Sequence, residues 1–145
     1  MDEPDGLTEW AADVPIAMRE DPLWRLPAYR YSLYLGDLVQ AELPRIRLSP
    51  STRALADQLH SSVQSISANI AEGYSRTTGP ERAKFFEYAL GSTREARDWV
   101  YKIRGTLDGP TAIFCIELLT RIMKILTVAI NAERRSPETS ARRPR

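Results

Sequence analysis

Apolar residues recur along this chain at alternating steps of three and four, the spacing that places side chains on one face of an α-helix. The clearest stripe consists of Ala56, Leu59, Val63, Ile66, Ile70 and Gly73. Ala68 lies beside it, and small residues allow another backbone to approach closely. We therefore expect the helix that carries Ala68 and Gly73 to pack tightly and to fix the arrangement of its neighbours.

The same spacing predicts four helices, over about residues 21–42, 50–75, 80–104 and 110–134, and no segment shows the alternation of a strand. Short links leave consecutive helices little choice but to lie antiparallel. The predicted fold is all-α, an antiparallel up-down-up-down four-helix bundle spanning residues 21–134. The predicted termini are a mobile acidic arm over 1–20 and a disordered basic tail over 135–145.

Capping residues and prolines mark the predicted helix ends. Asp21 and Ser49 each precede a proline and are predicted to cap the first and second helices. Pro44 is expected to end the first helix, because proline cannot donate the backbone hydrogen bond that a helix interior requires. Thr78 and Glu81, three residues apart, predict a capping box at the start of the third helix.

The third and fourth helices carry further stripes. That of the third helix is Phe85, Ala89, Ser92, Ala96, Trp99 and Ile103. Gly91 costs up to about 1 kcal/mol of helix propensity relative to alanine, so we expect it to face the small residues around Gly73. The fourth helix carries two adjoining stripes: Ile116, Leu119, Met123, Leu126 and Ile130, and Cys115, Leu118, Ile122, Ile125 and Ala129. An arc this wide suggests that another copy of the chain covers part of it.

Composition is that of an ordinary globular domain: 145 residues, 43% hydrophobic and 27% charged. No apolar run approaches the roughly 20 residues that cross a bilayer, and the N-terminus has no secretory pattern, so we expect a cytoplasmic protein without membrane contact. The formal net charge of +1 is uneven. Residues 1–21 carry seven acidic residues and one arginine, whereas five arginines and one glutamate lie in 134–145. Trp10 is a candidate anchor of the acidic arm onto the bundle.

Candidate catalytic chemistry is sparse. The single histidine, His60, and the single cysteine, Cys115, exclude the usual zinc sites and Cys-His nucleophiles. The Glu-x-x-His pairs of di-metal bundles do not occur in the sequence. We therefore expect no metal, no cofactor and no enzymatic activity.

One group of polar residues flanks the expected contact between the second and third helices: Asn69, Glu72, Ser92 and Glu95. Two carboxylates close together can perform acid-base chemistry. The favoured interpretation is a structural polar network that fixes the register of the two helices, with Arg76 or Arg97 as counter-charge.

Basic residues are the candidate nucleic-acid contacts. They cluster near the helix connections and along the third helix: Arg45, Arg47, Arg53, Arg76, Arg82, Lys84, Arg94, Lys102 and Arg104. They are either phosphate-contacting patches or an ordinary solvated face with surface ion pairs, and both interpretations stay open. Tyr74, Tyr88 and Tyr101 are likewise either base-stacking groups or packing residues.

A series of residues carries a family resemblance: Gln58-Leu59, Ser65-Ile66, Ala68-Asn69-Ile70-Ala71-Glu72-Gly73, Arg76, Glu81, Phe85, Ala89, Gly91-Ser92 and Glu95. The chain resembles the four-helix-bundle proteins encoded in intervening sequences of 23S ribosomal RNA, a group similar to the accessory proteins of diversity-generating retroelements. The match runs without a gap from Gln58 to Glu95 and more loosely over about 21–134. Ser67 stands where proline is usual, and Arg82 where an apolar residue is usual.

The resemblance implies a homo-pentameric bundle with a role in nucleic-acid binding and no known catalysis. Together with the basic clusters, it leads to the hypothesis of a non-enzymatic oligomeric scaffold that binds RNA or DNA. The alternative is a protein-protein interaction adaptor, for example a partner of a reverse transcriptase. Binding by such an adaptor would persist at high salt, because it would depend on apolar surface.

Overall fold

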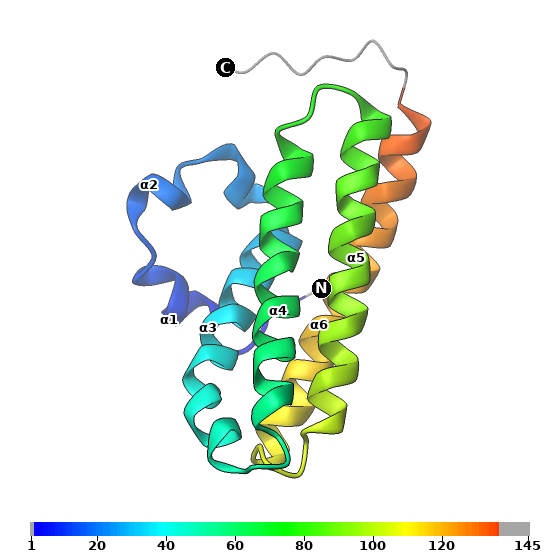
Figure 1. Ribbon diagram of the computed structural model, residues 1–145. Helices are drawn as coiled ribbons and strands as arrows, with labels where there is room; N and C mark the ends of the chain where they lie inside the picture. The colour runs from blue at the N-terminus through cyan, green and yellow to red at the C-terminus, as the bar shows by residue number, and fades with distance from the viewer. Residues whose placement is uncertain (1, 137–145) are drawn as a thin grey trace.

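The computed structural model describes residues 2–136, and four long helices dominate it (Figure 1). They are α3 (Pro27–Leu48), α4 (Arg53–Tyr74), α5 (Gly79–Lys102) and α6 (Gly109–Arg135). Three short elements precede them: α1 (Leu7–Ala12), α2 (Ile16–Arg19) and the 3-10 helix η1 (Pro22–Arg25). No strand occurs among the described residues. The predicted all-α fold is confirmed.

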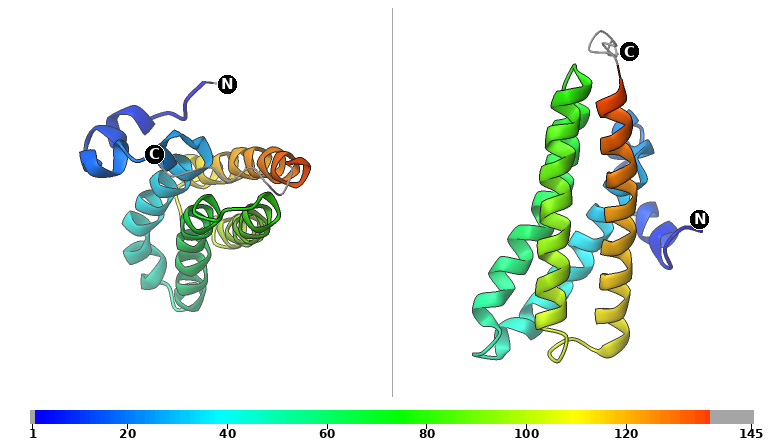
Figure 2. Two further views of the ribbon diagram at one scale, coloured as in Figure 1. Left: turned by 90° about the horizontal axis from the view of Figure 1, so that it is seen from above. Right: turned by 90° about the vertical axis from the view of Figure 1, so that its right-hand side faces the viewer.

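The long helices run alternately down and up, so each lies antiparallel to the next along the chain (Figures 1 and 2). The α4–α5 and α5–α6 contacts are the most extensive, followed by α3–α4, while α3 and α6 share a smaller seam. Seen from above, α3 is inclined to the other three helices (Figure 2). The bundle is therefore most tightly packed around α5.

The core is formed by the apolar stripes of the four helices. Every residue of the predicted α4 stripe, from Ala56 to Gly73, is buried. The predicted α5 stripe is confirmed at Ala89, Ala96 and Ile103, which are buried. At its other three positions the buried residue is the next one along the chain, since Phe86, Thr93 and Val100 are buried whereas Phe85, Ser92 and Trp99 are only half-buried. Thr93 satisfies its hydroxyl within the helix by donating to the carbonyl of Ala89 at 2.7 Å.

The wide apolar arc of α6 is accounted for within one chain. Every residue of its two predicted stripes is buried or half-buried, because α6 packs against both α5 and α3. The apolar residues of α6 that stay exposed lie outside those stripes: Ile113 is 59% and Val128 is 70% exposed. The width of the arc therefore does not itself require a second copy.

Several predicted helix ends are wrong. Asp21 does cap a helix, accepting a hydrogen bond from the Leu23 amide at 2.8 Å, but that helix is η1, and α3 starts at Pro27. Pro44 lies inside α3 and does not end it. Pro44 is exposed, and burial of Leu43 and Ile46 on either side outweighs the roughly 3 kcal/mol that an interior proline costs.

Of the three later helices, α5 and α6 begin with a side-chain cap and α4 does not. Ser49, predicted to cap the start of the second helix, is instead the C-terminal cap residue of α3. The next helix, α4, begins at Arg53 without a side-chain cap. The predicted cap of α5 is confirmed, since the Glu81 amide donates to Thr78 Oγ1 at 3.3 Å and the Thr78 hydroxyl donates to the Glu81 carboxylate at 3.0 Å. Sequence reasoning missed Asp108, which caps α6; hydrogen bonds from Thr111 lower the pKa of its carboxyl.

The acidic arm contacts the bundle over the part that the structure describes. Within residues 2–20, Pro4 and Leu7 are buried, and the Asp5 carbonyl accepts a hydrogen bond from the Tyr34 hydroxyl at 3.0 Å. Trp10 anchors the arm, as predicted, since its ring stacks on that of Trp24 with the ring centroids 6.0 Å apart. The arm also contacts α6, whose Arg121 donates to the Asp2 carbonyl. It thus covers the small seam between α3 and α6.

Most of the predicted basic tail, residues 137–145, lies outside the described part of the chain. Arg135 is the last residue of α6. In the part that the structure describes, no helix is both long enough and apolar enough to span a membrane.

Candidate nucleic-acid interface

The basic residues around the α3–α4 connection are engaged with carboxylates. Arg47 lies 3.0 Å from Asp57, and Arg45 lies 3.9 Å from both Glu42 and Asp108. Arg53 donates to the Arg47 carbonyl at 3.2 Å. These contacts are typical of a solvated surface, and they reduce the positive charge that this end offers to phosphate.

The basic residues around the α4–α5 connection divide into surface and buried groups. Arg76 pairs with Glu72 one turn earlier and lies 4.7 Å from the centroid of the Phe85 ring. Lys84 lies 5.9 Å from the centroid of the exposed Tyr88 ring. Both remain on the surface, where they can contribute to the local field.

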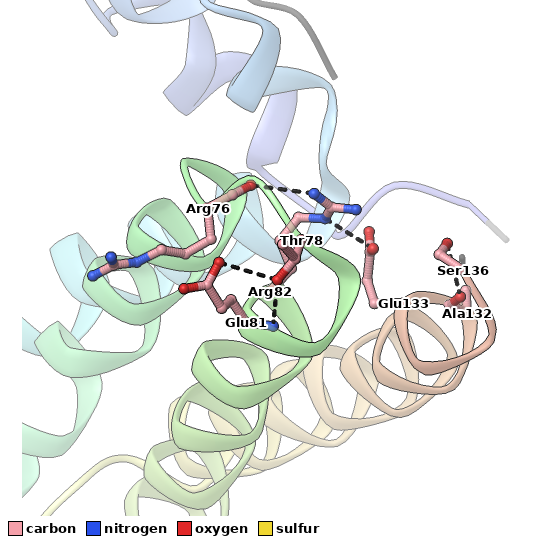
Figure 3. A network of polar contacts seen from close by, with 7 residues as sticks. All are labelled: Arg76, Thr78, Glu81, Arg82, Ala132, Glu133 and Ser136. Atoms are coloured by element: carbon pink, nitrogen blue, oxygen red, sulfur yellow. Dashed lines mark hydrogen bonds and ion pairs between the residues drawn. The ribbon is translucent and has the colours of Figure 1, made fainter. Parts of the chain in front are cut away.

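The prediction of Arg82 as a nucleic-acid contact is wrong, because its side chain is buried. It donates to Glu133 of α6 at 2.8 Å and to the Arg76 carbonyl at 3.2 Å (Figure 3). Nearby, a methyl group at Gly79 would lie 2.3 Å from the Glu133 carbonyl oxygen, so α5 and α6 meet closely here. Arg82 holds two helices together and is not available to a ligand.

A different group of basic residues shares one outer face, between α5 and α6. A shallow groove of about 400 Å³ is lined there by Arg94, Arg97, Asp98, Tyr101 and Ile116, and we call it the arginine groove. Arg97 donates to the Thr120 hydroxyl of α6 at 3.1 Å, which orients it along the groove. Within residues 2–136, neither Arg94 nor Arg97 forms an ion pair, because Asp98 pairs with Lys102 at 2.6 Å.

Tyr101 and Arg104 extend this face toward the end of α5. Tyr101 is 55% exposed, and the Arg104 guanidinium lies 3.9 Å from its ring centroid. Arg104 also donates to the Tyr101 carbonyl at 2.8 Å. The lining of the groove carries two arginines, Arg94 and Arg97, and one carboxylate, Asp98, which is paired with Lys102. This combination of unneutralised arginines and an exposed ring suits phosphate and base contacts.

Sequence reasoning identified Arg94, Lys102 and Arg104 but did not assign Arg97 to this surface. The signal was present, because Arg94, Arg97, Tyr101 and Arg104 follow one another at steps of three, four and three. Such spacing places them on one side of a helix, as the apolar stripes are placed. The sequence did not reveal that the neighbouring carboxylate, Asp98, pairs with Lys102 and leaves both arginines without an ion pair among the described residues.

The predicted polar network does not form as a unit. Asn69 donates to the Ser65 carbonyl at 2.9 Å, and the Ser65 hydroxyl bonds to that of Ser92 across the α4–α5 contact. Glu72 instead pairs with Arg76. Glu95 is exposed and accepts from the Trp99 indole at 3.2 Å. The two carboxylates therefore have separate partners, and the arrangement does not support acid-base chemistry.

The predicted close packing is also only partly correct. A methyl group at Gly73 would lie 2.9 Å from the Phe86 ring, so α5 does press on α4 there. Gly91, by contrast, is exposed, and a methyl group on it would meet no atom within 4 Å. Ala68 is exposed as well. Both face outward because the α4–α5 contact is centred on the buried stripes that include Ile70 and Ala89.

The remaining reactive side chains are isolated. Burial raises the pKa of the Cys115 thiol to about 11, so the thiolate that would act as nucleophile is rare at neutral pH. His60 is half-buried, and its Nδ1 has no hydrogen-bond partner among the described residues. Within residues 2–136, no group of three or more His, Cys, Asp or Glu side chains is placed to hold a metal ion.

Comparison with known proteins links this fold to a family. A search of curated proteins finds no match. Among solved structures, the chain is similar to a protein of unknown function from the S23 ribosomal protein family of Bacteroides thetaiotaomicron, with a TM-score of 0.65 and 19% sequence identity. The similarity covers 71% of this chain and 97% of the other. The profile of the 23S rRNA-intervening sequence proteins matches residues 44–128, and the chain belongs to this family.

Proposed function

We propose that this protein is a non-enzymatic binding protein that holds nucleic acid on the arginine groove and the adjoining Lys102 and Arg104. The observation that carries the proposal is that Arg94 and Arg97 have no ion-pair partner within residues 2–136, while the neighbouring Asp98 is paired with Lys102. Other basic clusters on the surface are largely neutralised by carboxylates. The Arg94 and Arg97 side chains are therefore able to contact a phosphate backbone.

The expected binding mode is electrostatic. Each arginine that neutralises a phosphate releases a condensed counterion, so the affinity falls as salt rises. Arginine also presents its donors as a planar fork that matches phosphate oxygens. Binding should therefore be measurable at low ionic strength and should weaken steeply toward physiological salt.

A salt titration of fluorescence anisotropy with a short labelled RNA or DNA tests the proposal. Replacing Arg94 and Arg97 together by glutamine should weaken binding by at least about tenfold at low salt and reduce the salt slope by about one for each arginine. The matched control replaces Arg45 and Arg47, which are already ion-paired, and should change the affinity much less. Absence of binding at low salt, or equal losses in the two double variants, contradicts the proposal.

We further propose that the protein self-associates, the property implied by its resemblance to pentameric bundles. Burial of the exposed Ile113 and Val128 of α6 in a contact between copies would remove apolar surface from water. A closed ring would repeat the arginine groove and strengthen its field. Mass measurement in solution tests this, and a monomer at all concentrations contradicts it.

The second candidate function is a protein-interaction adaptor, and the same exposed Ile113 and Val128 favour it. An apolar docking surface should retain its partner at high salt, unlike the arginine groove. Replacing Ile113 and Val128 by serine separates the two functions. This double replacement should weaken binding to a protein partner. The affinity of a single chain for nucleic acid should stay unchanged.

A further inference from the structure

Resting on the proposed function, we infer that the arginine groove is built for single-stranded nucleic acid, with one base stacked on Tyr101. The ring lines the groove together with Ile116, and Tyr101 stays 55% exposed although Arg104 lies over the ring. Every base presents a π-face, whatever the sequence of the strand, and stacking of bases on aromatic side chains is a common mode of single-strand binding. Arg104 lies over the Tyr101 ring, and an unpaired base would stack on the part of the ring that stays exposed.

The dimensions of the groove exclude a duplex from its floor. Packed helix axes are about 8–10 Å apart, and the groove between α5 and α6 holds about 400 Å³. That volume is at the low end for a small-molecule site. A splayed base with its sugar fits this scale, whereas the paired bases of a duplex are stacked inside the helix and cannot reach Tyr101.

The charges are arranged to hold the strand on both sides of that base. Arg94 lies two turns before Tyr101 on α5, about 10 Å along the helix axis, and Arg104, just beyond the end of α5, lies over the Tyr101 ring. Arg97 lies between, tied to Thr120 at 3.1 Å. A backbone that runs along α5 can therefore meet a guanidinium before and after the stacked base. Base stacking and phosphate contacts are thus separable by mutation.

Anisotropy titrations with a labelled single-stranded oligouridine and with a duplex of the same length test the inference on the full chain. The single strand should bind at least about tenfold more tightly. Tyr101→Ala should weaken single-strand binding by about 5- to 150-fold, which corresponds to the stacking of one base, without changing the salt slope. Tyr101→Phe should bind like the native chain, because the ring is retained.

Tyr88→Ala is the matched control, since Tyr88 is 50% exposed on α5 but lies outside the groove. Thermal unfolding of each variant confirms that the bundle is intact. The inference is overturned if the duplex binds as tightly as the single strand, or if Tyr101→Ala and Tyr88→Ala change the affinity equally. The proposed function stands in either case, provided that replacing Arg94 and Arg97 still weakens binding. If neither nucleic acid binds at low salt, both are overturned.

Discussion

Arg82 Nε lies 2.8 Å from a carboxylate oxygen of Glu133, and this buried ion pair joins the first turn of α5 to the last turns of α6. The two side chains are only 4% and 15% exposed. Glu133 therefore compensates a charge that would otherwise be buried alone. The pair explains how a cation is accommodated in the buried contact between α5 and α6.

Removing one partner of this pair should destabilise the fold. Arg82→Ala should lower the free energy of unfolding by about 3–5 kcal/mol, because it leaves Glu133 without its partner. Replacing both residues by apolar ones, as in Arg82→Met with Glu133→Leu, should recover most of the loss. Urea denaturation of the single and double variants gives the coupling energy. A coupling near zero would show that the pair is incidental.

The glycines of the α4–α5 hairpin should respond in opposite directions. Gly91→Ala should raise the free energy of unfolding by up to about 1 kcal/mol, because the position is exposed within a helix and has open space. Gly73→Ala should lower it, because the added methyl would collide with the Phe86 ring. Thermal melts of the two variants test this pair. Destabilisation by Gly91→Ala would mean that another surface presses on this position.

Trp10 should control whether the arm stays bound to the bundle. Its indole donates to Asp37 at 2.7 Å, and its ring centroid lies 5.3 Å from that of Tyr34. Trp10→Ala should cost about 1–3 kcal/mol, less than a fully buried tryptophan because the side chain is half-buried. Limited proteolysis should then cut residues 2–20 before the four long helices. Equal resistance in the native chain and the variant would show that other contacts hold the arm.

Cys115 should make the fold sensitive to alkaline pH. Its pKa is raised to about 11 in the folded state from 9.0, so the folded state favours the neutral thiol. This stability is fully present below pH 9 and is lost as the pH rises toward 11, by up to about 1.4 kcal/mol per pH unit. Burial also raises the pKa of Tyr29, Tyr31 and Tyr34 above 10.0, which adds to the loss at higher pH.

The difference in urea denaturation between the native chain and Cys115→Ala, measured between pH 8 and 10, isolates the thiol, because the tyrosines contribute equally to both proteins. The native chain should lose stability over this range more steeply than Cys115→Ala, whose lower starting stability does not affect the slope. At pH 7 a thiol reagent should modify Cys115 only when the chain unfolds. Fast modification of the folded chain would contradict the burial of this residue.

Local patterns in the sequence were sufficient to predict the bundle. The stripe from Ala56 to Gly73 and the cap formed by Thr78 depend on residues a few positions apart, where helical geometry alone decides. Pro44 was misjudged because its local cost is outweighed by burial of its neighbours against distant helices. The docking of Trp10 on Trp24 likewise depends on contacts that periodicity does not report.

The candidate site was predictable only in part. The basic character of α5 is visible in the sequence, but the pairing of each cation is a tertiary property. Arg82 and Glu133 are 51 positions apart, and Arg97 meets Thr120 across two helices. The sequence therefore grouped the buried Arg82 with Arg94 and assigned Arg97 to a network that does not form.

Photocrosslinking of a short single strand containing a photoreactive uridine analogue, followed by mass spectrometry of the peptides, locates the bound strand on the chain. Crosslinks are expected in the segment from Arg94 to Arg104, centred on Tyr101, and they should be suppressed by salt and by replacing Arg94 and Arg97 with glutamine. Crosslinks that map to the segment from Arg45 to Arg53, or that survive these changes, would contradict binding in the arginine groove.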